Sequence, residues 1–143
     1  MNQDNLISKA KEYCEGRGAR FTYLRESVYA LLLKHEGAIG AYDLLDELKR
    51  TEDSAKPATV YRALDFLLEH GLIHKVESDN TFVACQHFDC SHPVQFLICD
   101  DCGSVQEIQS SGVKESLEEQ ANNLGFKVRK QTIEAHGQCG KCI

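Results

Sequence analysis

Hydrophobic positions recur every three to four residues through the first half of the chain, and this spacing predicts amphipathic helices. The first predicted helix ends near residues 16–18, and the second begins after Thr22 as its N-cap. A third covers the stretch AYDLLDELKR (41–50). The residues expected to face inward are Leu6, Ala10, Tyr13 and Cys14, then Leu24, Val28, Leu31 and Leu32, and then Leu44, Leu45 and Leu48.

The stretch KPATVYRALDFLLEHG (56–71) carries the clearest helical pattern. Pro57 suits a first helical turn and Gly71 suits a C-terminal cap. One face is apolar and comprises Val60, Ala63, Leu64, Leu67 and Leu68. The opposite face carries Thr59, Tyr61, Arg62, Asp65 and Phe66.

Two β-prone runs, LIHKVES and TFVAC, follow this helix and flank the turn residues Asp79 and Asn80, which predicts a hairpin. Helices closed by a hairpin are the arrangement of a winged helix, a variant of the helix-turn-helix. The helix at 56–71 would then be the recognition helix and residues 72–85 the wing. A small helical domain without a DNA role fits the same pattern, so the pattern alone leaves both possibilities open.

The pattern changes from Phe96 onward. VQFLICDDCGSVQEI (94–108) predicts a strand, a cysteine-bearing turn and a second strand, and FKVRKQTIEAHG (126–137) predicts a third. Between them an amphipathic helix is marked by Val113, Leu117, Ala121 and Leu124 and ends at Gly125. A β-β-α-β unit of this size has a small core and would gain stability from a bound metal or from dimerisation.

Composition and charge narrow the class of protein. With 42% hydrophobic and 27% charged residues the chain is typical of a globular protein, and it has neither a signal-peptide pattern nor an apolar run long enough to span a membrane, so we expect it in the cytoplasm. The net charge of −6 opposes binding to nucleic acid. However, residues 16–25 hold Arg17, Arg20 and Arg25 without an acid, and residues 54–64 hold Lys56 and Arg62, so charge leaves the question open.

The seven cysteines are more naturally metal ligands or redox groups than disulfides in a reducing compartment. Cys99-x-x-Cys102 and Cys139-x-x-Cys142 together supply the four sulfurs of a closed, structural zinc site. A redox-active CxxC is the main rival, but such a motif normally opens a helix, whereas Cys99 ends a β-prone run. Cys14 is predicted to be a small buried hydrophobe.

Further metal-ligand residue types remain once these four cysteines are assigned: His74, Cys85, His87, Asp89, Cys90, His92 and Glu107. His74 and Cys85 fall on the two predicted wing strands, and His92 lies in the linker. A site drawing on both halves of the chain would suit a sensor, although the spacing alone does not establish one. Asp100 and Asp101 are expected to be solvated turn residues.

The stretches AYDLLDELK, KPATVYRALDFLLEHGLIHKVES, FLICDDCGSVQEI and IEAHGQCGKC resemble, in order, those of the ferric uptake regulator family of metal-responsive repressors, and most closely its zinc-responsive members. The resemblance runs from about residue 20 to residue 142. It implies a homodimer with an N-terminal winged helix and a C-terminal α/β domain. We therefore predict an α+β fold with a winged-helix DNA-binding domain at 1–85, a hinge at 86–93 and an α/β dimerisation domain, stapled by zinc, at 94–143.

The resemblance also implies two zinc ions per protomer. The structural ion would be held by Cys99, Cys102, Cys139 and Cys142, and a regulatory ion at the hinge by His74, Cys85, His92 and Glu107. The thiolate of Cys85 favours zinc over iron(II) or manganese(II). His87 and Asp89 could correspond to a further site of iron- and peroxide-sensing relatives, but Arg129 and Lys130 stand where its usual histidine is expected, so we predict no complete third site. Cys90 matches no ligand position of the family.

On the predicted recognition helix, Tyr61 and Arg62 match family residues that reach DNA bases, and an arginine there can pair with guanine in bidentate fashion. Thr59, Lys56 and Arg25 complete the predicted DNA-binding set. Family members usually carry Pro-Gln directly before the arginine that corresponds to Arg25, whereas this chain has Tyr23 and Leu24 there.

The predicted function is therefore a zinc-responsive transcriptional repressor, not an enzyme, that binds operator DNA as a dimer and controls zinc-uptake genes. Zinc at the hinge would favour the closed, DNA-binding arrangement of the two winged helices. Three alternatives stay open: an iron-, manganese- or peroxide-sensing repressor of the same family, a CxxC thiol oxidoreductase, and a zinc-stapled protein-interaction module.

Overall fold

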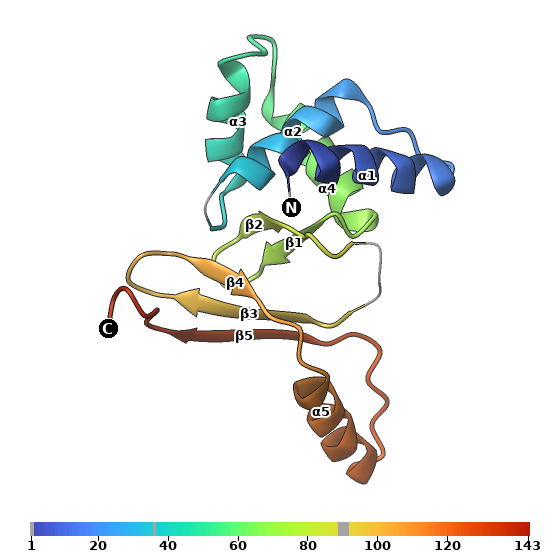
Figure 1. Ribbon diagram of the computed structural model, residues 1–143, viewed down its shortest axis with the longest axis vertical. Coiled ribbons are helices and arrows are strands. Elements are labelled where there is room, and N and C mark those ends of the chain that lie inside the picture. The colour runs from blue at the N-terminus through green and yellow to red at the C-terminus, as the bar shows by residue number, and fades with distance from the viewer. Residues whose placement is uncertain (1, 36, 89–91) are drawn as a thin grey trace. The chain divides into compact units, whose positions relative to one another are not determined.

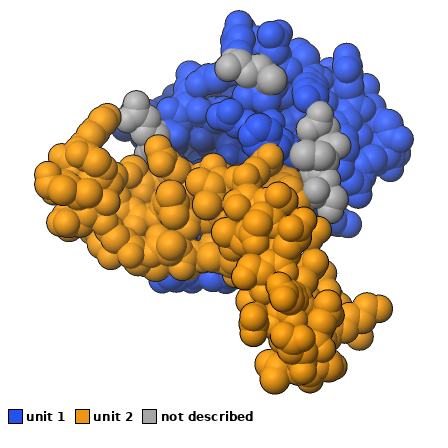
Figure 2. All heavy atoms as spheres, turned by 60° about the horizontal axis from the view of Figure 1, so that its bottom comes forward, with its two compact units in different colours: residues 1–90 blue, residues 91–143 orange. Residues whose placement is uncertain are grey.

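The computed structural model describes residues 2–35, 37–88 and 92–143, and the chain divides into two compact units, residues 1–90 and 91–143 (Figures 1 and 2). The first unit contains α1 (Gln3–Gly16), α2 (Tyr23–Lys34), α3 (Ala41–Lys49), α4 (Pro57–Glu69), β1 (Ile73–Val76) and β2 (Thr81–Ala84). The second contains β3 (Val94–Cys99), β4 (Val105–Glu107), α5 (Ser111–Asn123) and β5 (Thr132–Gly137). The mixed α and β content agrees with the predicted fold class.

The helices of the first unit begin and end where local chemistry predicts. The Thr22 side chain accepts a hydrogen bond from the Arg25 backbone N–H and caps α2, and Pro57 occupies the first turn of α4. After α4, Gly71 has a φ of +71°, which a residue with a Cβ adopts only under strain. The predicted boundaries of these helices are confirmed to within a few residues.

A single hydrophobic core joins the elements of the first unit, and it contains the predicted inward-facing residues Leu6, Ala10, Val28, Leu44 and Leu64 among others. β1 and β2 form an antiparallel hairpin with Val76 opposite Thr81. Ile39, which precedes α3, exchanges two backbone hydrogen bonds with Phe82 of β2, of 2.9 and 2.8 Å. This contact fastens the hairpin to the helices, as expected for the wing of a winged helix.

The second unit is a three-stranded sheet in the order β4-β3-β5, with β4 antiparallel and β5 parallel to the central β3. The predicted β-β-α-β order is confirmed, but the prediction of a strand over residues 126–137 is wrong in extent. β5 begins only at Thr132, because its partner β3 begins at Val94, directly opposite. Residues before Thr132 therefore have no strand beside them to complete a ladder.

The polar side chain of Gln95 is buried inside this unit, on β3. Its amide exchanges two hydrogen bonds, both of 3.1 Å, with the backbone of Ser110, which precedes α5. These bonds satisfy the buried amide and fix the start of the helix against the sheet.

Within the described residues no helix is both long enough and apolar enough to cross a membrane.

Candidate metal centres and nucleic-acid surface

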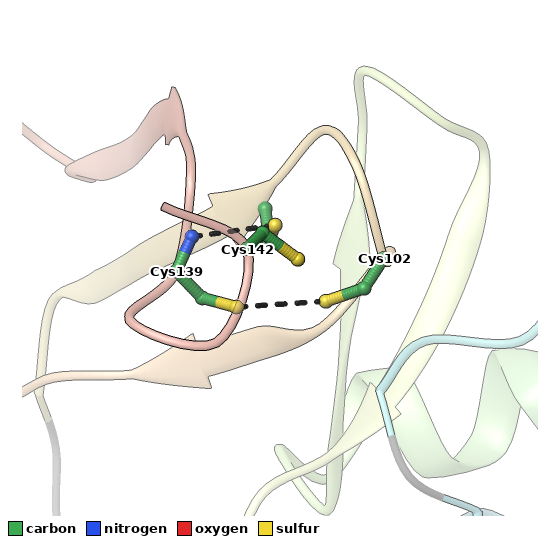
Figure 3. Close-up of side chains that lie close together, drawn as sticks. Cys102, Cys139 and Cys142 are labelled. Atoms are coloured by element: carbon green, nitrogen blue, oxygen red, sulfur yellow. Dashed lines mark hydrogen bonds between the residues drawn. The ribbon is translucent and has the colours of Figure 1, made fainter.

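Four cysteine sulfurs converge at one end of the three-stranded sheet. Cys99 is the last residue of β3 and pairs with Gly137 at the end of β5, so the turn after β3 and the segment after β5 leave the sheet side by side. The sulfur atoms of Cys99, Cys102, Cys139 and Cys142 all lie within 4.8 Å of one another. Cys102 Sγ and Cys139 Sγ are 3.7 Å apart (Figure 3). Two cysteine pairs that are at least 37 positions apart in sequence thus form one cluster.

Backbone N–H groups aim at two of these sulfurs and favour the thiolate form, which is the form that binds metals. Hydrogen bonds from the backbone of Cys102 and Cys139 lower the pKa of the Cys99 thiol to about 6. The Cys139 N–H lies 3.3 Å from the Cys99 sulfur. The backbone N–H of Lys141 likewise lowers the pKa of Cys139. Hydrogen bonding to Cys139 instead raises the pKa of Cys142 to about 12.

The donor set of this cluster fits a structural zinc ion. Zinc in structural sites is held by four ligands in a closed tetrahedron, and four cysteines from two tight turns are a common set. The geometry also counts against the redox alternative, because Cys99 ends a strand and the residues that follow it form a turn rather than a helix.

Two acidic residues in the turn after β3 tie it to the segment after β5. Asp100 accepts a hydrogen bond from His136 Nδ1 at 3.0 Å, which raises the pKa of that histidine, and its backbone N–H donates to the Gly137 oxygen at 2.8 Å. Asp101 accepts a 2.6 Å bond from the Gln138 amide. Both carboxylates are exposed, as expected for turn residues, but they also hold the two cysteine pairs together. Sequence reasoning missed this role, because the signal lies only in which strands are neighbours.

His74 and Cys85 form a ligand pair on the hairpin of the first unit. His74 lies opposite Val83 and Cys85 follows two residues later, so both side chains lie on the same face. Their candidate ligand atoms are within 4.8 Å of each other. Cys85 is fully buried, its sulfur accepts a hydrogen bond of 3.4 Å from the His87 N–H, and its carbonyl accepts one from Tyr29.

His92 and Glu107 form a second pair, in the other unit. His92 precedes β3, and Glu107 ends β4, opposite Phe96. The His92 ring nitrogen Nε2 donates to Glu107 Oε1 at 2.7 Å, and the side chains are only 10% and 14% exposed. This contact between an imidazole and a carboxylate is short and largely shielded from solvent. It brings a borderline ligand and a hard ligand together, where a metal ion could replace the proton that they share.

The remaining predicted ligands divide into two groups. His87 is exposed, and its backbone N–H contacts the Cys85 sulfur. Asp89 and Cys90 lie outside the described residues, so the predictions made for them rest on sequence alone. Within the part of the chain that the structure describes, the ligand atoms that lie together inside one unit are those of the four cysteines, of the pair His74 and Cys85, and of the pair His92 and Glu107.

The exposed face of α4 carries the residues predicted to contact DNA. Tyr61 is 43% exposed and Arg62 is also exposed, while Val60 and Leu64 beside them are buried in the core. Lys56 is exposed at the N-cap, and Thr59 is half-buried. The core thus holds one face of α4 and leaves the other, with a tyrosine and an arginine near its N-terminal end, free to enter a groove.

The remaining predicted DNA-binding residue, Arg25, lies on α2 and is half-buried. Its guanidinium stacks over the Phe66 ring of α4 at 3.9 Å and donates a hydrogen bond to the Arg20 carbonyl. Sequence reasoning assigned Phe66 to the exposed face but missed this stack, which depends on how α2 packs against α4.

A winged-helix unit followed by an α/β unit that ends in a four-sulfur cluster defines a class of protein that combines a DNA-binding fold with a metal centre. Residues 16–136 match the profile of the Ferric uptake regulator family, and the chain belongs to this family.

Among its relatives, the zinc uptake regulation protein of Escherichia coli (strain K12) is 48% identical over 139 residues, which cover 96% of this chain and 81% of that protein. A solved structure of a zinc uptake regulator complexed with zinc and DNA matches with a TM-score of 0.92 and 46% identity, covering 99% of this chain and 95% of the other. The crystal structure of holo XcZur matches with a TM-score of 0.85 and 42% identity, covering 96% of each chain.

Proposed function

We propose that this protein is a zinc-responsive transcriptional repressor that binds operator DNA as a homodimer and controls genes for zinc uptake. The observation that carries the proposal is the similarity of nearly the whole chain, at 46% identity, to a regulator solved with both zinc and DNA. The exposed Tyr61–Arg62 face of α4 and the metal-ligand residues of the two units supply the parts that such a function requires.

The structural zinc is assigned in this proposal to Cys99, Cys102, Cys139 and Cys142. Their spacing, their convergence and the N–H groups aimed at Cys99 and Cys139 all suit a closed four-thiolate site. The ion would cross-link the end of β3 to the last residues of the chain, and binding free energy of this kind adds directly to folding.

The regulatory zinc is assigned to His74, Cys85, His92 and Glu107. Each unit offers two of these ligands, whereas zinc prefers four, so a complete set requires both pairs. Filling that set would couple the winged helix to the second unit. The Cys85 thiolate makes the set softer than one built from histidines and carboxylates alone, which favours zinc over iron(II) and manganese(II).

Repression then follows from linkage between two binding sites. If zinc favours the arrangement in which the two α4 helices of a dimer fit successive half-sites, operator DNA and zinc strengthen each other's binding by the same factor. When zinc is scarce the DNA affinity falls and transcription resumes. The chain's own residues supply the contacts, with Arg62 and Tyr61 reaching base edges.

The test is a metal titration of operator binding. The operator is a duplex selected by the zinc-loaded protein from a random-sequence pool, and binding is followed by fluorescence anisotropy with zinc, iron(II) or manganese(II). We expect zinc to restore tight binding at the lowest free concentration. Restoration by iron(II) alone would assign the protein to the iron-sensing branch instead. Rapid disulfide exchange by the metal-free protein, without operator binding, would favour the oxidoreductase alternative.

A further inference from the structure

The basic segment at residues 16–25 contains Arg25, whose part in DNA binding the proposed function leaves unspecified. Arg25 of α2 lies with its guanidinium carbon 3.9 Å above the centre of the Phe66 ring, on α4. One of its N–H groups donates to the carbonyl oxygen of Arg20. The aromatic face and the carbonyl together hold a side chain that would otherwise sample many rotamers. Arg25 is therefore fixed against the recognition helix before any ligand binds.

The stack places Arg25 at a defined position along α4. Phe66 follows Arg62 by four residues, so the two side chains lie on the same face of the helix, one turn apart. In helix-turn-helix proteins the N-terminal part of the recognition helix contacts base edges. Residues one turn further on lie closer to the rim of the groove, where the phosphates are. Arg25 lies beside this second turn, because it stacks on Phe66.

The charge of this region suits a phosphate. Neither Arg20 nor Arg25 lies within ion-pair distance of a described carboxylate, and Arg20 is exposed. A guanidinium has five N–H donors in a planar fork that matches phosphate oxygens, and the contact with Arg20 uses only one donor of Arg25.

The wing, by contrast, is poorly suited to contact a phosphate backbone. Its hairpin carries a single cation, Lys75, whose amino group lies 3.7 Å from a carboxylate oxygen of Glu77. Glu77 and Asp79 near the turn are exposed. Their negative charges would repel a neighbouring phosphate.

We propose that Arg20 and Arg25 form a phosphodiester-binding surface beside α4, that the Phe66 ring preorganises it, and that the wing contributes no backbone contact. The proposal deepens the proposed function, because it rests on DNA binding and names the groups that supply the sequence-independent part. It assigns base selection to Arg62 and Tyr61, and phosphate attraction to Arg20 and Arg25.

The experiment measures the dissociation constant against salt concentration for the zinc-loaded protein, on the selected operator and on a random-sequence duplex of equal length. Each phosphate contact that is lost lowers the salt slope by about 1. We expect Arg20→Ala and Arg25→Ala each to lower the slope by about that amount and to weaken both duplexes by the same factor. Arg62→Ala should weaken the operator by about tenfold or more and the random duplex far less.

Three further variants separate the parts of the proposal. Lys75→Ala, the matched loss of a wing cation, should leave the slope unchanged. Arg25→Lys keeps the charge and should keep the slope while weakening binding. Phe66→Leu should weaken both duplexes in the wild-type background but add nothing to Arg25→Ala, as a double-mutant cycle requires of a residue that acts through its neighbour. Arg20→Ala changes only an exposed loop side chain, so this test survives even if a substitution of Arg25 impairs folding.

Unchanged slopes for Arg20→Ala and Arg25→Ala, or an equal loss for Lys75→Ala, would overturn this inference and leave the proposed function intact. A wild-type protein that binds both duplexes equally with zinc would instead overturn the proposed function, while reduced slopes in the variants would still support the phosphate surface. A wild-type protein with no affinity for either duplex would overturn both.

Discussion

Substitution of Cys85 gives the most direct test of the proposed zinc-sensing site. Its side chain is fully buried, its sulfur accepts the His87 N–H and its carbonyl accepts the hydroxyl of Tyr29. Burial raises the pKa of Tyr29 well above its usual value, so this hydroxyl stays a donor at neutral pH. The Cys85 carbonyl is therefore anchored by a hydrogen bond that does not involve the thiol.

We expect Cys85→Ala to yield a folded protein that retains one zinc ion but whose DNA binding no longer responds to zinc, because only the proposed regulatory set loses a ligand. The measurement is operator affinity at controlled free zinc. Cys14→Ala is the matched control, since Cys14 is an equally buried free cysteine of the same unit that lies outside both ligand sets. A normal zinc response in Cys85→Ala would remove this residue from the sensing site.

The interpretation of Cys14 as a small buried hydrophobe is confirmed by its complete burial on the inner face of α1. Burial raises the pKa of its thiol, so Cys14 is neutral at physiological pH and unsuited to metal binding or exchange.

At the scale of elements, α5 is an amphipathic helix whose apolar side is exposed in the part of the chain that the structure describes. Val113, Leu117 and Leu124 are 39%, 44% and 84% exposed, and Phe126 after the helix is 65% exposed. The helical spacing predicted this stripe, and the structure places none of it in a core. A run of large apolar side chains in solvent is the mark of an interface, which agrees with the proposed homodimer.

Leu117→Asp should therefore weaken dimerisation, because a carboxylate would be buried in the interface. Sedimentation or light scattering across a dilution series would show the shift toward monomer, with operator binding weakened in parallel. Asn122→Asp adds the same charge on the opposite side of α5 and serves as the control. If both variants stayed dimeric, or both dissociated alike, α5 would not form the interface.

At the scale of the whole molecule, the two zinc assignments predict different consequences of metal loss. Four thiolates would close the proposed structural site and join β3 to the residues after β5, so its ion should leave slowly. The regulatory set includes a carboxylate and two histidines and should release zinc to a mild chelator. Zinc content should fall from two ions per chain to one as operator affinity is lost, with the fold retained.

Metal analysis and circular dichroism on the same samples would check this result. Cys99→Ser provides the complementary case, since it should destabilise the second unit and the dimer rather than abolish sensing alone. Loss of both ions together under mild chelation, or a stable dimeric Cys99→Ser protein, would contradict the separation of the two sites.

The sequence by itself determined most of the elements and predicted the four cysteines whose sulfurs lie together. Helical and alternating periodicity, caps at Thr22 and Gly71, and two CxxC pairs are local signals, because backbone geometry and metal-ligand spacing act over a few residues. The same signals located the exposed face of α4. The sequence did not determine the length of β5, because the length of a strand depends on the strand that pairs with it.

Tertiary structure decided the contacts made between distant segments. Asp100 and Asp101 bind the residues after β5, and Arg25 stacks on Phe66, only because sheet order and helix packing make them neighbours. These contacts leave no periodicity in the sequence, because the partners are 36 or more positions apart. The sequence supplied the prediction of which side chains carry metal and DNA chemistry, and the packing of the chain decided which side chains within each unit lie together.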